Sequence, residues 1–255
     1  LPAELERRSF LDPSAALPEI ASRLVAGRES GNLPLDQRAA LHAMAAEAYR
    51  QLGRSAELMA ESRAGLEVWD VTGHSPLSAR LRAIHAMALA QNSDGAAALR
   101  EIDAAVAEYS SDRRTHACLL NDRGWLRYRD GNIEGALHDL IAAHETLRTV
   151  GAMDEAMVAA GRLAAVYRVS RYDDEAAVLV RDSIEHFEKL GAWVRVATGR
   201  SRLGWILADQ QKFGAALEEF LEMRGLSERA RDPLGVAYAD IAICAIQITQ
   251  REFAL

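Results

Sequence analysis

A segment of about 40 residues recurs five times along this chain, and such a period restricts the fold more than any local pattern does. Each copy contains two stretches with helix-type hydrophobic spacing on either side of a short turn. We align the copies on the residue that opens the second stretch, which gives successive spacings of 40, 38, 40 and 40 residues. The aligned residues are Leu58, Ala98, Ala136, Ala176 and Ala216. A chain that repeats in this way buries its apolar faces by stacking neighbouring copies.

The predicted helix ends keep the same register. Five residues before each aligned position a short turn is predicted, at Gly53, Ser93, Gly131, Arg171 and Gln211. Fifteen residues after it come Gly73, Gly151 and Gly191, placed to end helices in a left-handed conformation. Helix starts are predicted at Ser75 and Asp232, which precede prolines, and at the capping residues Asp112 and Asp154.

Residues 121–140 read N-D-R-G-W-x-x-Y-R-D-G-N-x-x-x-A-L-x-x-L, which resembles the tetratricopeptide repeat. The small residue of that family's first helix, helix A, matches one residue in each copy: Ala46, Ala86, Gly124, Ala164 and Gly204. The copies are longer than the family's usual repeat, as in the variants found in bacterial signalling proteins. The resemblance covers residues 37–255 and implies an all-α fold, a right-handed α-solenoid of stacked antiparallel helix pairs.

We expect two parts in the chain. Residues 1–36 are predicted to hold an irregular start followed by a capping helix, and residues 37–255 five repeats plus helix A of a sixth. That last helix is apolar on more than one face and has no second helix to cover it. Residues 236–250, with Ile241 and Ile248, are therefore a predicted interface, either for a two-fold homodimer or for a following domain.

The resemblance implies that helix A side chains line a concave groove that binds a protein or peptide segment. Trp125 and Trp205 occupy equivalent positions two repeats apart and would suit peptide anchoring. Alternatively, both fill space between repeats. The predicted ligand-binding residues are Arg80, Asn121, Trp125, Tyr128, Arg129, Arg162, Arg168, Ser201, Arg202 and Trp205.

Arg162 and Arg202 are also equivalent, 40 residues apart. Two interpretations stay open for them: a clamp for an anionic group such as the terminal carboxylate that some family members bind, or salt bridges within the chain.

Composition excludes several classes of function. A net charge of −7 and a pI near 5.6 argue against general nucleic-acid binding, which needs clustered positive charge. No apolar run approaches the roughly 20 residues of a membrane span, so no direct membrane insertion is predicted. Seven histidines and two cysteines show no metal-ligand spacing, and no phosphate loop or activated nucleophile is recognisable. We predict no cofactor, no metal and no catalytic residue in this region.

Three functions fit these observations. The first is the sensory or regulatory region of a larger bacterial signal-transduction protein, such as a membrane-tethered GGDEF diguanylate cyclase with its repeats on the periplasmic face of the inner membrane. The second is the repeat region of a cytoplasmic transcription regulator. The third is a free-standing assembly adaptor, which the absence of a polar capping helix disfavours.

Overall fold

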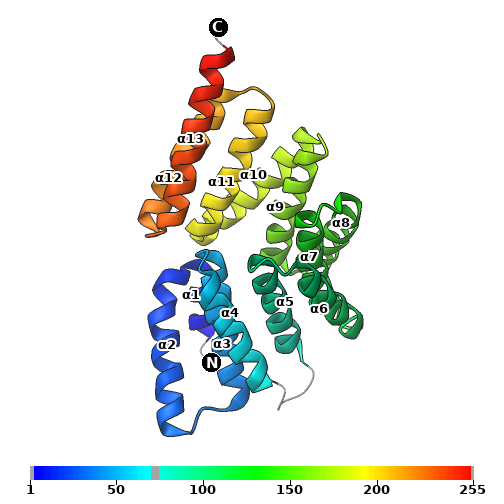
Figure 1. Ribbon diagram of the computed structural model, residues 1–255, viewed down its shortest axis with the longest axis vertical. Coiled ribbons are helices and arrows are strands. Elements are labelled where there is room, and N and C mark those ends of the chain that lie inside the picture. The colour runs from blue at the N-terminus through cyan, green and yellow to red at the C-terminus, as the bar shows by residue number, and fades with distance from the viewer. Residues whose placement is uncertain (1–2, 70–74, 254–255) are drawn as a thin grey trace. The chain divides into compact units, whose positions relative to one another are not determined.

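The chain forms a series of α-helices joined by short connections (Figure 1). The computed structural model describes residues 3–69 and 75–253, and within those ranges it contains helices and no strand. The chain divides into two compact units, Leu1–Met153 and Asp154–Leu255.

The first unit holds eight helices over its described residues, and the second holds five, of which α9 begins at the boundary residue. In the first unit the helices are α1 (Ala3–Leu11), α2 (Pro13–Ser30), α3 (Leu35–Gln51), α4 (Ser55–Trp69), α5 (Pro76–Gln91), α6 (Gly95–Glu108), α7 (Arg113–Arg129) and α8 (Ile133–Thr149). In the second they are α9 (Met153–Val169), α10 (Asp173–Leu190), α11 (Trp193–Asp209), α12 (Phe213–Arg229) and α13 (Pro233–Phe253).

The repeat register predicted from the sequence is confirmed. The aligned residue is the fourth of its helix in α4, α6, α8, α10 and α12, and its side chain is fully buried in all five. The matching small residues of helix A allow close approach: a β-carbon at Gly124 would lie 2.8 Å from Leu140, and one at Gly204 2.8 Å from Phe220. Each unit is therefore built from antiparallel helix pairs stacked side by side, and the predicted all-α solenoid class is confirmed.

The predicted turns also lie where expected. All five turn residues have positive φ angles: Gly53 at 69°, Ser93 at 66°, Gly131 at 86°, Arg171 at 66° and Gln211 at 60°. Gly151 and Gly191 adopt the left-handed conformation as well, and Gly73 lies outside the described residues. The left-handed residue reverses the chain within a few residues, so that the second helix packs back on the first.

The N-terminal segment differs from the prediction. Residues 3–11, expected to be irregular, form α1, and α2 follows with Asp12 as its cap. Leu5 of α1 and Ile20 of α2 are buried in one cluster with Leu41 and Met44 of α3. Burial of Leu5 against two other helices stabilises a nine-residue helix that would be marginal alone. The division of the chain at residue 36 stays a prediction.

Three of the four predicted capping residues act as caps. Ser75 forms a capping box at α5, Asp112 accepts hydrogen bonds from the first-turn amides of α7, and Asp232 accepts one from Gly235. The prediction for Asp154 is wrong, because α9 already begins at Met153 and places Asp154 inside its first turn. There its carboxylate lies 2.7 Å from Nε2 of His186 on α10.

A periodic contact between an acidic and a basic side chain, which was not predicted from the sequence, joins the two helices of most repeats. The residue three positions after the aligned one is acidic in four of the five repeats: Glu61, Glu101, Asp139 and Glu219. Each contacts a basic side chain of its helix A at 2.7 to 2.9 Å, namely His42, His85, Arg123 and Arg200 respectively. The fourth repeat has Leu179 at this position. The recurring acidic residue is visible in the sequence. Its basic partner is not, because the position of the partner on helix A differs by one helical turn between repeats.

Candidate functional site

The ten residues predicted to bind a ligand lie on helix A of four successive repeats. Five belong to the first unit, with Arg80 on α5 and Asn121, Trp125, Tyr128 and Arg129 on α7. The other five belong to the second unit, with Arg162 and Arg168 on α9 and Ser201, Arg202 and Trp205 on α11. A single groove shared by all ten stays a prediction.

Trp205 joins three helices of the second unit. Its ring packs edge-on against Phe220 of α12, with ring centroids 5.1 Å apart. Its indole N–H donates a hydrogen bond of 2.9 Å to the hydroxyl of Tyr238 on α13. Trp205 is half-buried and Tyr238 is 47% exposed, so the pair offers an aromatic surface that is fixed on one side and open on the other.

Tyr238 was not predicted from the sequence as part of this surface. Its place in α13 has no aromatic counterpart in the preceding repeats, where Thr198 and Val158 stand at 40-residue intervals. Only the packing of α13 beside α11 brings the Tyr238 hydroxyl to the indole of Trp205.

Arg168 is held by an ion pair. Its Nη1 lies 2.7 Å from Oδ2 of Asp209, which links α9 to α11, and each side chain is about one-third exposed. The pair lies partly in solvent, so an anionic group of a ligand would compete with Asp209 for the guanidinium. For Arg168 the structure therefore gives an intramolecular salt bridge.

Arg162 and Arg202 lie on adjacent helices and differ in exposure. Arg162 is buried, whereas Arg202 is half-buried and extends over Gly161 of α9, where a β-carbon would lie 2.8 Å from its Nη1. The close approach depends on Gly161, because any side chain there would displace the guanidinium. Burial of Arg162 limits direct contact with a ligand, so Arg202 and the half-buried Ser201 are the more accessible members of this group.

In the first unit, Trp125 and Tyr128 form an aromatic pair on α7, with ring centroids 5.2 Å apart. Trp125 also packs against a buried cluster that includes Met87 and Ile102. Both aromatic side chains are half-buried. Trp125 therefore fills space between repeats with part of its ring and leaves the rest accessible.

The polar members of the set in the first unit differ in exposure. Asn121 is buried, one helical turn before Trp125. Arg80 is exposed, and its Nη1 lies 3.4 Å from Oε1 of Glu6 on α1. Arg129 is exposed at the last residue of α7. Arg80 and Arg129 thus remain open to a ligand, and Asn121 is enclosed by the helices around it.

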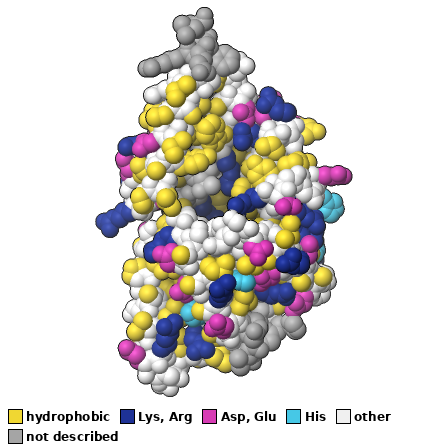
Figure 2. All heavy atoms as spheres, viewed as in Figure 1, with side chains coloured by type: hydrophobic (Ala, Val, Ile, Leu, Met, Phe, Trp, Pro, Cys, Tyr) yellow, Lys and Arg dark blue, Asp and Glu magenta, His cyan; other side chains and the backbone are white. Residues whose placement is uncertain are grey.

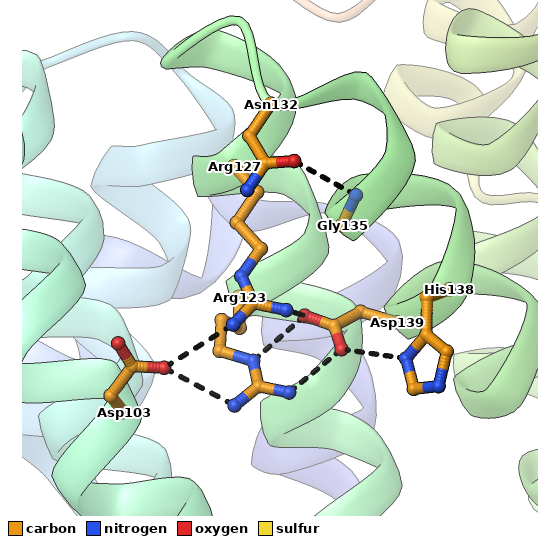
Figure 3. A network of polar contacts seen from close by, with 7 residues as sticks. All are labelled: Asp103, Arg123, Arg127, Asn132, Gly135, His138 and Asp139. Carbon is orange, nitrogen blue, oxygen red and sulfur yellow. Dashed lines mark hydrogen bonds and ion pairs between the residues drawn. The ribbon is translucent and has the colours of Figure 1, made fainter.

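An ionic network lies between α6, α7 and α8 in the first unit (Figure 3). Arg123 donates two hydrogen bonds of 2.7 Å to the carboxylate of Asp139, which Arg127 also contacts at 2.8 Å. Asp103 of α6 lies 3.2 Å from Arg123 on the other side. The side chain of Asp139 is fully buried, and its hydrogen bonds raise the pKa of Arg123 above its ordinary value. Two arginines face two aspartates, so this network is internally neutralised and holds the repeats together.

Within residues 3–69 and 75–253 no three His, Cys, Asp or Glu side chains are grouped so as to hold a metal ion. No helix in that part of the chain has the length and apolar character of a membrane span.

Comparison with known proteins identifies the fold. Neither a protein-family model nor a curated protein matches this sequence. Among solved structures, a Rap protein complexed with Competence and Sporulation Factor is 14% identical, with a TM-score of 0.65 over 98% of this chain and 73% of that one. BtubC from P. vanneervenii is 16% identical, with a TM-score of 0.60 over 80% of this chain and 85% of its own.

A third similar structure is a signal transduction ATPase with numerous domains that carries a tetratricopeptide repeat sensor, from Pyrococcus horikoshii. It is 14% identical, with a TM-score of 0.56 over 86% of this chain and 34% of that one. At these identities the likeness concerns the fold alone. The chain has a TPR-like fold.

Proposed function

We propose that this chain is a non-catalytic scaffold that binds a protein or peptide segment. We further propose that it is the sensory or regulatory region of a larger bacterial signal-transduction protein, such as a membrane-tethered GGDEF diguanylate cyclase with its repeats on the periplasmic face. The observation that carries the binding function is the half-exposed pair of Trp205 and Tyr238, fixed by a hydrogen bond across two helix A elements.

Three physical features support peptide binding at this pair. Phe220 holds the Trp205 ring in one orientation, so a ligand would not have to order it. Large aromatic side chains with one open face are frequent anchors in protein interfaces. Partly exposed polar groups adjoin the pair on the same helix, namely Ser201, Arg202 and Asp209. Such groups could pair with the backbone or the charged side chains of an extended or helical segment.

Two of the similar structures are consistent with this proposal. The Rap protein is seen in complex with Competence and Sporulation Factor, and the ATPase carries its repeats as a sensor. The second similarity favours an alternative in which this chain is the repeat region of a cytoplasmic regulator with an ATPase module. A free-standing assembly adaptor is a third candidate.

Peptide binding can be tested with a phage-displayed random peptide library selected against the wild-type chain. The selected peptides should bind Trp205→Ala about tenfold or more weakly than wild type, as for loss of an aromatic anchor. Trp193→Ala is the matched control, because Trp193 lies at the start of the same helix as Trp205 and is also half-exposed. That variant should bind the selected peptides like wild type.

Circular dichroism and melting temperatures separate loss of binding from loss of folding. If Trp205→Ala lowers the melting temperature while binding per folded molecule is unchanged, Trp205 is only a packing residue and the binding proposal fails. A selection that enriches no peptide above the unselected library would also contradict the proposal.

The signalling context needs a separate observation. Sequencing the gene beyond the codon for Leu255 should reveal an apolar span of about 20 residues followed by a GGDEF motif. A helix-turn-helix or an ATPase module in the same gene would favour the cytoplasmic regulator, and a stop codon after one polar helix would favour the adaptor.

A further inference from the structure

An ion pair adjoins the aromatic surface of Trp205. Asp209 stands four residues after Trp205 on α11, so the two side chains lie on one face of the helix, about 6 Å apart along its axis. Asp209 accepts a hydrogen bond from Arg168 of α9, with Nη1 2.7 Å from Oδ2. In Figure 2 hydrophobic side chains lie at the surface over α11 and α13, and basic side chains lie beside them. A ligand on the Trp205 ring would therefore reach this ion pair.

The ion pair leaves most of its hydrogen-bonding capacity unused. Among the described residues, the contact between Nη1 and Oδ2 is the one polar contact that Arg168 and Asp209 make. Arginine has five N–H donors, and one carboxylate can accept two of them side by side. Both side chains are about one-third exposed, so the other donors of Arg168 stay available to a second carboxylate.

Basic side chains outnumber acidic ones on the two helices that hold the pair. Beyond the first turn of α9, Asp209 is the one acidic residue of α9 and α11. The same segments carry five arginines, namely Arg162, Arg168, Arg195, Arg200 and Arg202.

Three of these arginines are turned away from the Trp205 surface or enclosed. Arg195 lies over the ring of Phe187 on α10. Arg200 forms ion pairs with residues of α10 and α12, and Arg162 is buried. The remaining two, Arg168 and Arg202, are partly exposed close to the indole, so the charge around the Trp205 surface favours an anionic ligand.

We infer that the Trp205 surface binds an acidic peptide and that Asp209 is an internal competitor of this ligand. The inference rests on the proposed function and names the ligand class of the same site. In the free protein the Asp209 carboxylate occupies Arg168, and in the complex a carboxylate of the peptide binds that guanidinium. An ion pair that lies partly in solvent contributes little to stability, so the ligand can displace Asp209 without unfolding either helix.

The geometry of α11 sets the spacing of residues in the ligand. In an extended peptide, residues two positions apart point to the same side and lie about 6.6 Å apart. This distance matches the rise of about 6 Å from Trp205 to Asp209. We therefore expect an aspartate or glutamate two positions from an apolar or aromatic residue. The apolar side chain packs on the indole while the carboxylate reaches Arg168.

The peptides selected from the random library against the wild-type chain give the first test. Relative to the unselected library, they should be enriched in an acidic residue two positions from an apolar one. A set of binding peptides without this enrichment would overturn the inference and leave peptide binding in place. A selection that yields no peptide would overturn both.

Substitutions at the ion pair should change the affinity for a selected acidic peptide in opposite directions. Arg168→Gln should weaken binding about tenfold or more, because the guanidinium that holds the ligand's carboxylate is lost. Asp209→Asn should strengthen binding about two- to fivefold, because the competing carboxylate is removed. Fluorescence anisotropy of the labelled peptide measures both changes. The same peptide with asparagine or glutamine at its acidic positions should bind wild type and both variants with equal affinity.

Asp240→Asn is the matched control. Asp240 pairs with Arg224 of α12 at 2.7 Å, so this substitution removes the same charge from another interhelical ion pair of the second unit. It should leave the affinity for the acidic peptide unchanged.

Three results would overturn the inference. One is an Asp209→Asn variant that binds the acidic peptide no more tightly than wild type does. Another is an Asp240→Asn variant that gains as much affinity, which would reduce the effect to net charge. The third is an Arg168→Gln variant that binds like wild type. Melting temperatures check that Arg168→Gln stays folded, and loss of folding cannot produce the gain in affinity expected for Asp209→Asn.

Discussion

Helix α11 packs most closely against α12 at Gly204. A β-carbon at this position would lie 2.8 Å from two carbons of the Phe220 ring, which is itself fully buried. The ring cannot easily move, because Trp205 packs against it. By contrast, a β-carbon at Gly225 inside α12 would meet no atom within 4 Å apart from its chain neighbours and the backbone of its own helix, and the φ angle of Gly225 is not positive.

The two glycines should therefore respond to alanine with opposite signs. Gly204→Ala should lower the free energy of unfolding by about 1 to 3 kcal/mol, through overpacking against Phe220. Gly225→Ala should raise it by about 0.5 to 1 kcal/mol, because alanine is favoured over glycine inside a helix. Urea unfolding of both variants measures the difference, and a stabilised Gly204→Ala would show that α12 can move away without cost.

Asp139 is the fully buried carboxylate that neutralises Arg123 and Arg127, whereas Asp103, on the other side of Arg123, is half-exposed. Asp139→Asn should lower the free energy of unfolding by about 3 kcal/mol, because the partly buried guanidinium groups of Arg123 and Arg127 lose the buried carboxylate that they share. Asp103→Asn should cost no more than about 1 kcal/mol, as for an exposed ion pair. Equal effects in chemical denaturation would mean that solvent reaches Asp139 as readily as Asp103.

The turn inside each repeat depends on one left-handed residue. Gly131 has a φ of 86° and no steric conflict, whereas Gln211 adopts 60° with a side chain. The helix pair α11–α12 therefore forms despite a less favourable turn residue, which indicates that packing between the helices supports the turn.

Exchanging the turn residues should reveal this difference. Gly131→Ala should lower the free energy of unfolding by about 1 kcal/mol, and Gln211→Gly should raise it by up to about 0.5 kcal/mol, since glycine relieves left-handed strain but gains freedom when unfolded. Thermal melting measures both changes. If Gly131→Ala left the free energy of unfolding unchanged, the turn would have to adopt another conformation in that variant.

Stability along the whole chain should follow the stacking of repeats. Each helix packs mainly on its neighbours in sequence, so a helix at the end of the array has fewer partners than one in the middle. The short α1, held by contacts with α2 and α3, should exchange its amide hydrogens faster than α7, which packs on α5, α6 and α8. Hydrogen exchange followed by mass spectrometry measures this gradient, and equal protection in both helices would indicate that the first unit opens all at once.

The repeat register, the helix pairs and the turns could be read from the residues alone. Each depends on contacts within about 40 residues: small residues where two helices touch, and turn residues that reverse the chain. Residues such as Ala136 and Gly131 have the same role in every copy, so five copies reinforce one pattern. The helical state of residues 3–11 was not predictable in this way, because α1 belongs to no copy of the repeat and is stabilised by burying Leu5 against other helices.

The side-chain contacts of the candidate site depend on tertiary structure more than the helices and turns do. The sequence placed Trp205 and Arg168 on helix A, but only the packing of neighbouring repeats joined Trp205 to Tyr238 and Arg168 to Asp209. These contacts link residues 33 and 41 positions apart, and neither pairing recurs in the other repeats, so no periodic signal marks them. Burial of Arg162 and Asn121 likewise follows from how closely adjacent helices approach. A repeated pattern determines the local fold because the same positions pack the two helices of every copy together. Side-chain contacts between copies depend instead on residues that differ from one copy to the next.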